Sequence, residues 1–198
     1  MNQFRQRRLL LSGGIGAGKS EVALILTSRG VPVTHTDEIG HSVLEPEGEA
    51  YSAVSSRWPQ VVVEGRIARD RLATIVFADP ETLGELEAMT HPFIAAGVFA
   101  ELERYSDDPL VVVEIPHLSD LLGDDWIRVV VAAPSQVRFQ RLLSRGMDPE
   151  DARARMAAQP SDSEWREAAD FVIDNSADVA RLGEEVDRVL AAISNSLR

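Results

Sequence analysis

The feature that most constrains this chain is a glycine-rich octapeptide that lies between an apolar run and a helical pattern. Residues 13–20 read Gly-Gly-Ile-Gly-Ala-Gly-Lys-Ser, which fits G-x-x-x-x-G-K-[ST] without a mismatch. Residues 9–12 before it form a strand candidate, and residues 21–28 after it carry apolar side chains at helical spacing. Strand, glycine loop and helix in this order predict an α/β fold that begins with this unit.

The residue types of the octapeptide are those that a phosphate-binding loop requires. Glycines let successive backbone N–H groups point at phosphate oxygens, and the helix that follows adds its positive N-terminal end. The lysine reaches the β- and γ-phosphates, and the serine hydroxyl binds Mg²⁺. A glycine-rich turn that matches by chance is the alternative, but the flanking strand and helix favour a nucleotide site. The predicted ATP-binding residues are Gly14, Ile15, Gly16, Ala17, Gly18, Lys19, Ser20 and Glu21, together with Arg145 further along the chain. Lys19 is also predicted to be catalytic, and Ser20 to be a Mg²⁺ ligand.

Four further apolar runs, at residues 31–34, 110–115, 127–132 and 170–173, are typical of strands separated by helices. We therefore expect an α/β fold with a five-stranded parallel sheet covered by helices. Residues 38–107 predict a helical insertion, with breaks near Pro46, Pro59, Pro80 and Pro92. The expected organisation is one domain over residues 1–198, with a core of about 8–37, 108–134 and 168–198, this insertion, and an arginine-bearing helical segment at about 135–167.

Composition excludes several classes of protein. A formal net charge of −12 disfavours binding to a nucleic-acid backbone. The absence of cysteine excludes disulfides, thiolate metal sites and a cysteine nucleophile. No apolar run approaches the roughly 20 residues that span a bilayer, and no signal-peptide pattern is present. We expect a cytoplasmic protein, a monomer or weak oligomer, with no membrane, nucleic-acid or protein partner indicated.

Other polar residues fit a kinase that uses ATP and a small-molecule acceptor, since the guanine-reading Asn-Lys-x-Asp of GTPases is absent. Arg141 and Arg145 share a helix face at i, i+4 and could stabilise charge on the transferred phosphoryl group, or form a solvated face. Glu114 ends the most apolar strand and could orient Mg²⁺ through water, or be a charge at the sheet rim. Asp37 follows the second strand and is catalytic in this interpretation; a helix N-cap is the alternative.

An ordered series of short segments resembles the dephospho-CoA kinase family over about residues 9–175. The glycine loop with its Gly-Gly-Ile-Gly start is the most specific piece. The further segments are Asp37-Glu38-Ile39, Val43-Leu44-Glu45-Pro46, Arg71-Leu72 with Ile75-Val76-Phe77, His91-Pro92, Glu114-Ile115-Pro116, Arg141 with Arg145, Arg155 with Gln159, and Ala169-Asp170 with Asn175. The resemblance implies that ATP phosphorylates the ribose 3′-hydroxyl of dephospho-CoA. It also implies that the insertion holds the acceptor and that the segment at 135–167 is a lid over ATP.

The chain departs from the family pattern at three places. His35 replaces the first carboxylate of Asp-x-Asp, the position that the family would use as the acceptor-side base. His35, through a neutral imidazole, or Asp37 could accept the hydroxyl proton instead. The family's Pro-Leu-Leu-x-Glu reads Pro116-His117-Leu118-Ser119-Asp120, and Glu21 stands where threonine is usual. A paralogue with another acceptor and a catalytically weak nucleotide-binding module are therefore the alternatives.

Overall fold

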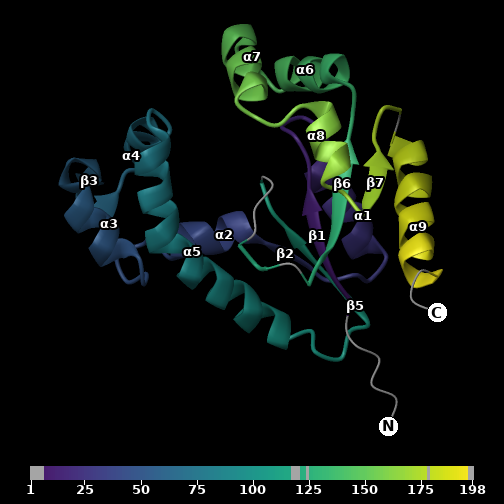
Figure 1. Cartoon of the computed structure of the whole chain (residues 1–198), viewed down its shortest axis with the longest axis horizontal. Coiled ribbons are helices and arrows are strands. Elements are labelled where there is room, and N and C mark those ends of the chain that lie inside the picture. Colours follow the sequence, from purple (N-terminus) through teal and green to yellow (C-terminus); the bar gives the residue numbers. More distant parts are fainter. Residues whose placement is uncertain (1–6, 117–120, 124, 178, 196–198) are drawn as a thin grey trace. The chain divides into compact units, whose positions relative to one another are not determined.

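The computed structural model describes residues 7–116, 121–123, 125–177 and 179–195, so His117 lies outside the described residues (Figure 1). The chain divides into two compact units. The first, here called the loop unit, comprises Met1–Thr34 and Tyr105–Arg198. The second, here called the helical unit, comprises His35–Arg104. Each unit has a hydrophobic core of its own.

The loop unit is built on a five-stranded parallel sheet in the order β2-β5-β1-β6-β7. Its strands are β1 Arg7–Ser12, β2 Val33–His35, β5 Leu110–Glu114, β6 Ile127–Ala132 and β7 Phe171–Asp174. Val111, Val112 and Val113 are all buried, as expected for a strand covered on both faces. The predicted five-stranded α/β fold is confirmed. The second strand begins two residues later than predicted, after Pro32, which has no N–H for a ladder bond.

Helices cover this sheet and complete its core. They are α1 Lys19–Ser28, α6 Ser135–Ser144, α7 Pro149–Ala157, α8 Asp162–Glu167 and α9 Val179–Asn195. Alternate residues of β1, Leu9 and Leu11, lie in one apolar cluster with Val22 of α1 and Val186 of α9. Figure 1 shows α9, in yellow, running beside β7. Leu182, Val186, Val189 and Ile193 of α9 all lie in this cluster, so they form a core-facing stripe at helical spacing.

The predicted helical segment at about 135–167 consists of three helices, because two caps interrupt it. Asp148 begins α7 by accepting hydrogen bonds from the backbone N–H groups of Glu150 and Asp151 at 2.8 and 3.3 Å. Ser161 begins α8 in a capping box with Glu164. Each cap satisfies backbone donors that a helix start leaves without partners.

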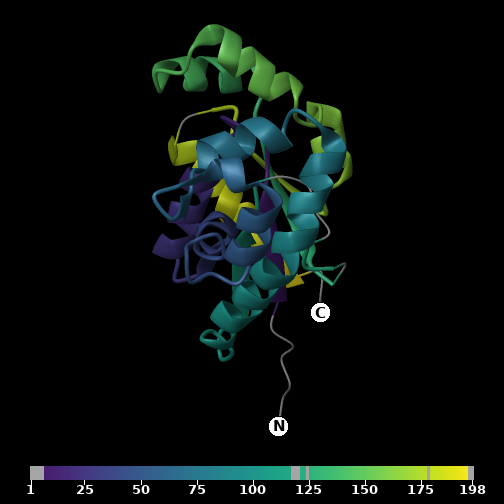
Figure 2. The same cartoon turned by 90° about the vertical axis from the view of Figure 1, so that its left-hand side faces the viewer.

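The helical unit contains α2 Thr36–Ser42, α3 Tyr51–Arg57, a 3₁₀ turn Pro59–Val61, α4 Arg69–Val76 and α5 Pro80–Glu103. A two-stranded hairpin, β3 Val62–Val63 and β4 Arg66–Ile67, lies between α3 and α4. Its buried core includes Val54, Trp58, Val61, Leu72 and Val76. Figure 2 faces this unit and shows α3, α4 and α5 packed together.

The predicted helix break near Pro92 is wrong. Helix α5 continues through Pro92 over 24 residues, although proline lacks the N–H of one i→i−4 hydrogen bond. The helix contacts α2, α3 and α4, so packing on both sides of the proline outweighs the lost bond. Pro80, in contrast, is the first residue of α5, where Asp79 caps the helix by accepting from the N–H of Thr82 at 2.9 Å.

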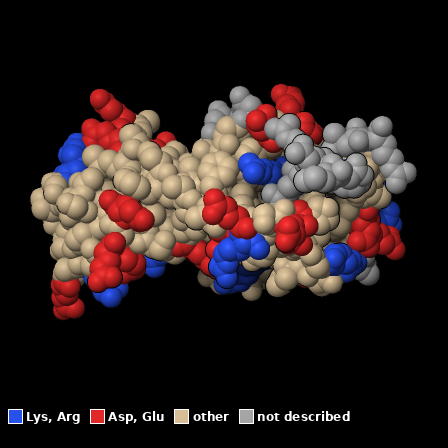
Figure 3. Space-filling model, turned by 90° about the horizontal axis from the view of Figure 1, so that it is seen from below, with Lys and Arg blue, Asp and Glu red and all other residues tan. Residues whose placement is uncertain are grey.

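Charged residues of both signs are interspersed on the face shown in Figure 3, so the net negative charge does not gather there into one acidic patch. Among the described residues, the helices are too short or too polar to qualify as membrane spans.

Candidate active site

The glycine loop joins the end of β1 to the start of α1 in the loop unit. Gly16 and Gly18 have φ angles of 78° and 99°, which side chains with a Cβ rarely adopt. A Cβ at Gly18 would also lie 2.2 Å from Nδ2 of Asn175. The left-handed Gly18 is the N-cap of α1, so the helix begins directly after the curled loop. This arrangement aims backbone N–H groups and a positive helix end at one place, as an anion site requires.

Lys19 is the first residue of α1, and its side chain turns back over the loop. Its Nζ donates a hydrogen bond to the carbonyl oxygen of Gly13 at 2.9 Å, so the ammonium bridges the two ends of the loop. Lys19 is also the chain's only lysine. Ser20 and Glu21 are exposed, which leaves the Ser20 hydroxyl accessible and places the Glu21 side chain in solvent.

Arg141 of α6 and Asn175, which follows β7, meet the loop at Ala17. Arg141 donates through Nη1 to the Ala17 carbonyl at 3.3 Å, and through Nη2 to the carbonyl and Oδ1 of Asn175 at 3.0 and 3.2 Å. Asn175, only 5% exposed, donates through Nδ2 to the same Ala17 oxygen at 2.7 Å. Arg141 is thus held against the loop by charge-assisted hydrogen bonds. Arg145 caps the end of α6 with an exposed side chain, and within the described residues no hydrogen bond joins it to the loop.

Glu114 lies at the edge of the sheet from which the loop emerges. It is the last residue of β5 and is paired with Leu11, two residues before the loop. Its carboxylate and the Ser20 hydroxyl are hard oxygen donors of the kind that Mg²⁺ prefers. The described part of the chain holds no cluster of three or more His, Asp or Glu side chains placed to hold a metal ion. This donor set fits an ion that takes most of its ligands from substrate phosphates and water.

His35 and Asp37 lie where the chain passes from the sheet of the loop unit into the helical unit. His35 is the last residue of β2 and the N-cap residue of α2, although its side chain makes no capping hydrogen bond. Asp37 lies in the first turn of α2 and is exposed. The helix dipole favours a negative charge at this position. The structure therefore brings together Lys19 and Arg141 at the loop, and it places His35 and Asp37 two residues apart at the start of α2.

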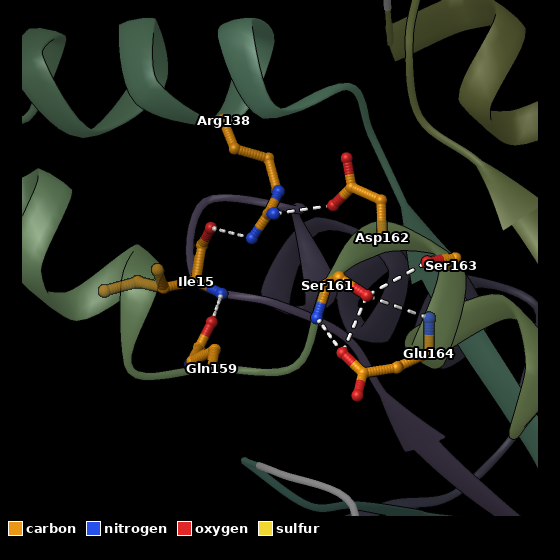
Figure 4. A network of polar contacts seen from close by, with 7 residues as sticks. All are labelled: Ile15, Arg138, Gln159, Ser161, Asp162, Ser163 and Glu164. Carbon is orange, nitrogen blue, oxygen red and sulfur yellow. Dashed lines mark hydrogen bonds and ion pairs between the residues drawn. The ribbon is translucent and has the colours of Figure 1, made fainter.

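Three side chains at the loop escaped prediction as site residues: Arg138, Gln159 and Asp162. Arg138 of α6 is only 4% exposed, and its Nη2 lies 2.6 Å from Oδ1 of Asp162. Its Nη1 donates to the carbonyl of Ile15 at 3.4 Å, and Oε1 of Gln159 accepts from the N–H of Ile15 at 2.7 Å (Figure 4). The sequence shows Arg138 as one of six arginines between residues 135 and 167, with no pattern that separates the buried one from the others.

The parallel sheet presents a glycine loop with a lysine at the start of α1, and an arginine of α6 contacts this loop. These features define the P-loop kinase class. The family model described as dephospho-CoA kinase matches residues 8–181. The chain belongs to the dephospho-CoA kinase family, a family of enzymes. A curated dephospho-CoA kinase of Methylococcus capsulatus is 40% identical over 185 residues, covering 89% of this chain and 91% of the relative. One from Frankia casuarinae is 36% identical over 183 residues, covering 90% and 80%.

Solved structures agree with this assignment. A crystal structure of a Thermus thermophilus protein is 35% identical, with a TM-score of 0.84 and coverage of 98% of both chains. A dephospho-CoA kinase from Campylobacter jejuni is 26% identical, with a TM-score of 0.67 over 96% of this chain and 98% of the other. A shikimate kinase from Acinetobacter baumannii, at 19% identity and a TM-score of 0.52, shares the fold alone.

Proposed function

We propose that this chain transfers the γ-phosphoryl group of ATP to the ribose 3′-hydroxyl of dephospho-CoA, which gives ADP and coenzyme A. The observation that carries the proposal is the family match over residues 8–181, within which the phosphate-binding loop is complete. The bond between the γ-phosphorus and the β,γ-bridging oxygen breaks, a bond from the 3′-oxygen to the γ-phosphorus forms, and the hydroxyl proton leaves to a base or water.

The loop unit supplies the nucleotide side of this reaction in our proposal. The loop from Gly14 to Glu21 binds the phosphates by its backbone, and Lys19 leaves the Gly13 carbonyl to reach the β- and γ-oxygens. Arg141 adds positive charge where the leaving ADP becomes more negative, and Arg145 binds ATP from the end of α6. Mg²⁺ would neutralise phosphate charge, with the Ser20 hydroxyl as ligand and Glu114 acting through water.

Local cations explain how a chain with a net charge of −12 could bind ATP. Lys19, Arg138 and Arg141 all contact backbone carbonyls of the loop, and the charge of Arg138 is compensated by Asp162, so Lys19 and Arg141 supply the positive charge at this site. Charges this close dominate over distant carboxylates, which salt screens beyond roughly 10 Å.

The acceptor side is assigned to the helical unit, which largely coincides with the predicted insertion at 38–107. We propose that His35 or Asp37 takes the proton from the 3′-hydroxyl, and that residues 135–167 close over ATP as a lid. A closed lid would exclude water and limit ATP hydrolysis. We further propose that the protein acts in the cytoplasm as a monomer or weak oligomer.

The deciding experiment measures ADP formation from ATP-Mg²⁺ with 3′-dephospho-CoA, in wild type and in His35→Asp, from pH 6 to 9. Turnover that depends on dephospho-CoA, with coenzyme A identified by mass, supports the proposal. If His35 is the base, the pH dependence of the rate should differ between wild type and His35→Asp. ATP binding without turnover in either variant would refute the acceptor and direct the search to other hydroxyl compounds.

A further inference from the structure

Two consecutive peptide groups at the middle of the glycine loop are held from outside the loop. The N–H of Ile15 belongs to the Gly14–Ile15 peptide and donates to Oε1 of Gln159 at 2.7 Å. The carbonyl of Ile15 belongs to the Ile15–Gly16 peptide and accepts from Nη1 of Arg138 at 3.4 Å. Figure 4 shows both side chains reaching Ile15 from different segments of the loop unit. We call Gln159, Arg138 and Asp162 the Ile15 clamp.

The loop needs such a restraint because glycine flanks both peptide groups. Glycine populates conformations closed to other residues, so peptide planes beside it reorient at little steric cost. At Gly14, a Cβ would lie 2.2 Å from Nη1 of Arg138 and 3.3 Å from Oε1 of Gln159. The clamp side chains therefore occupy the space that the missing Cβ leaves, and they fix planes that the glycines would otherwise leave free.

Neighbouring residues hold Arg138 and Gln159, the two clamp side chains that contact Ile15. Arg138 is almost fully buried and pairs with Asp162 at 2.6 Å, whereas its Nε is buried without a hydrogen-bond partner in the described part of the chain. Burying an incompletely satisfied cation contributes little to stability, so its position calls for another role. Gln159 precedes the capping box of α8, in which the carboxylate of Glu164 accepts from the N–H of Ser161 at 2.7 Å.

We infer that Gln159 and Arg138 are positioning residues that hold the glycine loop in its ATP-receiving shape, so that ATP affinity depends on their docking against Ile15. A preformed loop pays less conformational entropy when the phosphates arrive. Linkage then requires the reverse effect, in which bound ATP strengthens the docking of residues 159–162 on the loop. The inference rests on the nucleotide site proposed above, and it assigns no contact with the acceptor.

The first test compares Gln159→Met with wild type, since methionine keeps the length of the side chain and removes the acceptor. Amide hydrogen exchange at Ile15, followed by NMR without nucleotide, is expected to accelerate at least about threefold, while exchange in the sheet stays unchanged. The Kd for a non-hydrolysable ATP analogue with Mg²⁺, measured by calorimetry, is expected to rise by about threefold to tenfold, the size of one lost hydrogen bond. Gln136→Met is the matched control, because Gln136 is an exposed glutamine that lines one open surface groove together with Arg138 and Gln159.

Arg138→Lys provides a second measurement that keeps the charge and removes the fork that reaches both Asp162 and Ile15. It too should raise the Kd for the analogue and leave the KM for dephospho-CoA unchanged, and its effect should be less than additive with that of Gln159→Met. Unchanged ATP affinity and Ile15 exchange in Gln159→Met would overturn the inference. Tighter binding in Gln159→Met would also overturn it, because Gln159 would then compete with phosphate. Ile15 amide exchange and the Kd for the ATP analogue are both measured without acceptor. Failure of the acceptor assignment therefore leaves these two measurements valid.

Discussion

The loop unit and the helical unit are stabilised by contacts of very different reach. In the loop unit, Ile15 bonds to Gln159 across 144 residues and Ala17 bonds to Asn175 across 158. In the helical unit, Tyr51 bonds to the carbonyl of Gly65 across 14 residues, and Arg57 to Glu85 across 28. A continuous stretch of chain can thus build a core of its own between two strands of the sheet. The glycine loop, in contrast, is held by side chains that come from far along the sequence.

Replacement of Lys19 by alanine is expected to have the largest effect and to fall on the loop unit alone. Loss of the ammonium removes charge stabilisation of the transferred phosphoryl group, and kcat should fall by roughly 10²–10³-fold. The unfolding midpoint should change much less than kcat, although the hydrogen bond from Nζ to the Gly13 carbonyl is lost. Steady-state kinetics and thermal unfolding check both statements.

Lys19 also allows a direct control. Because it is the only lysine, an amine-reactive reagent can modify only this side chain and the N-terminus. ATP-Mg²⁺ should protect Lys19 but not the N-terminal amine, as read by mass spectrometry. Equal labelling of Lys19 with and without ATP would contradict its assignment to the phosphates.

Leu72→Ala tests whether the helical unit closes on its own core. Leu72 is 3% exposed within that core, and its truncation should cost about 2–5 kcal/mol. We expect weaker cooperativity in denaturant unfolding and loss of turnover, with the Kd for ATP kept. Phe77→Ala, at a side chain 74% exposed in the same unit, is the control and should change neither. A parallel loss of ATP affinity in Leu72→Ala would show that the two units do not fold independently.

Asn175→Ala should weaken the loop unit from a position far from the loop in sequence. The buried amide supplies a hydrogen bond to Ala17 and accepts from Arg141, so its removal should cost about 1–3 kcal/mol of stability. Chemical denaturation measures this loss, and Asn195→Ala, at the end of α9, is the control. An unchanged free energy of unfolding would mean that water replaces the amide without cost.

Low pH should lower the free energy of unfolding of both units. Among the substitutions predicted here, the one at Asp79 should have the smallest effect. Hydrogen bonds from the side chain and backbone of Thr82 lower the pKa of Asp79, and those from Ser176, with the charge of Arg166, lower the pKa of Asp174. A carboxyl with a lowered folded-state pKa stabilises the protein above its unfolded pKa, and this contribution disappears as pH falls through the folded value. Unfolding free energies should therefore decrease below about pH 4, near the ordinary pKa of aspartate.

Asp79→Asn separates the two units in this acid response. Asparagine still caps α5 but does not titrate, so the variant should lose less stability than wild type between pH 7 and pH 3. Denaturant unfolding at both pH values measures the difference, and Asp70→Asn, in the first turn of α4, is the control. An unchanged pH dependence in Asp79→Asn would remove Asp79 from this explanation.

The sequence by itself determined the five strands of the parallel sheet, the glycine loop and the family. The strand predicted at residues 127–132 is β6 with the same bounds, since buried β-branched runs and glycines act through local conformation. The ordered segments that resemble the family could be found in the sequence for the same reason. Local geometry restricts which residue types can stand at a turn or at the end of a strand. The base at His35 or Asp37 stays a prediction, since the same residue types also occur as simple helix caps.

Only the tertiary structure decided which polar side chains meet the loop. Arg138 and Arg141 lie on one helix, yet the first contacts Ile15 and the second Ala17, and no local pattern separates them from the exposed Arg145. Gln159 and Asn175 reach the loop because β6 and β7 follow β1 in the sheet order. Helix α5 likewise continues through Pro92 because of packing. Local propensity contributes only a small free energy per residue. Strand order and burial act through many contacts at once, so they decide where local propensity does not.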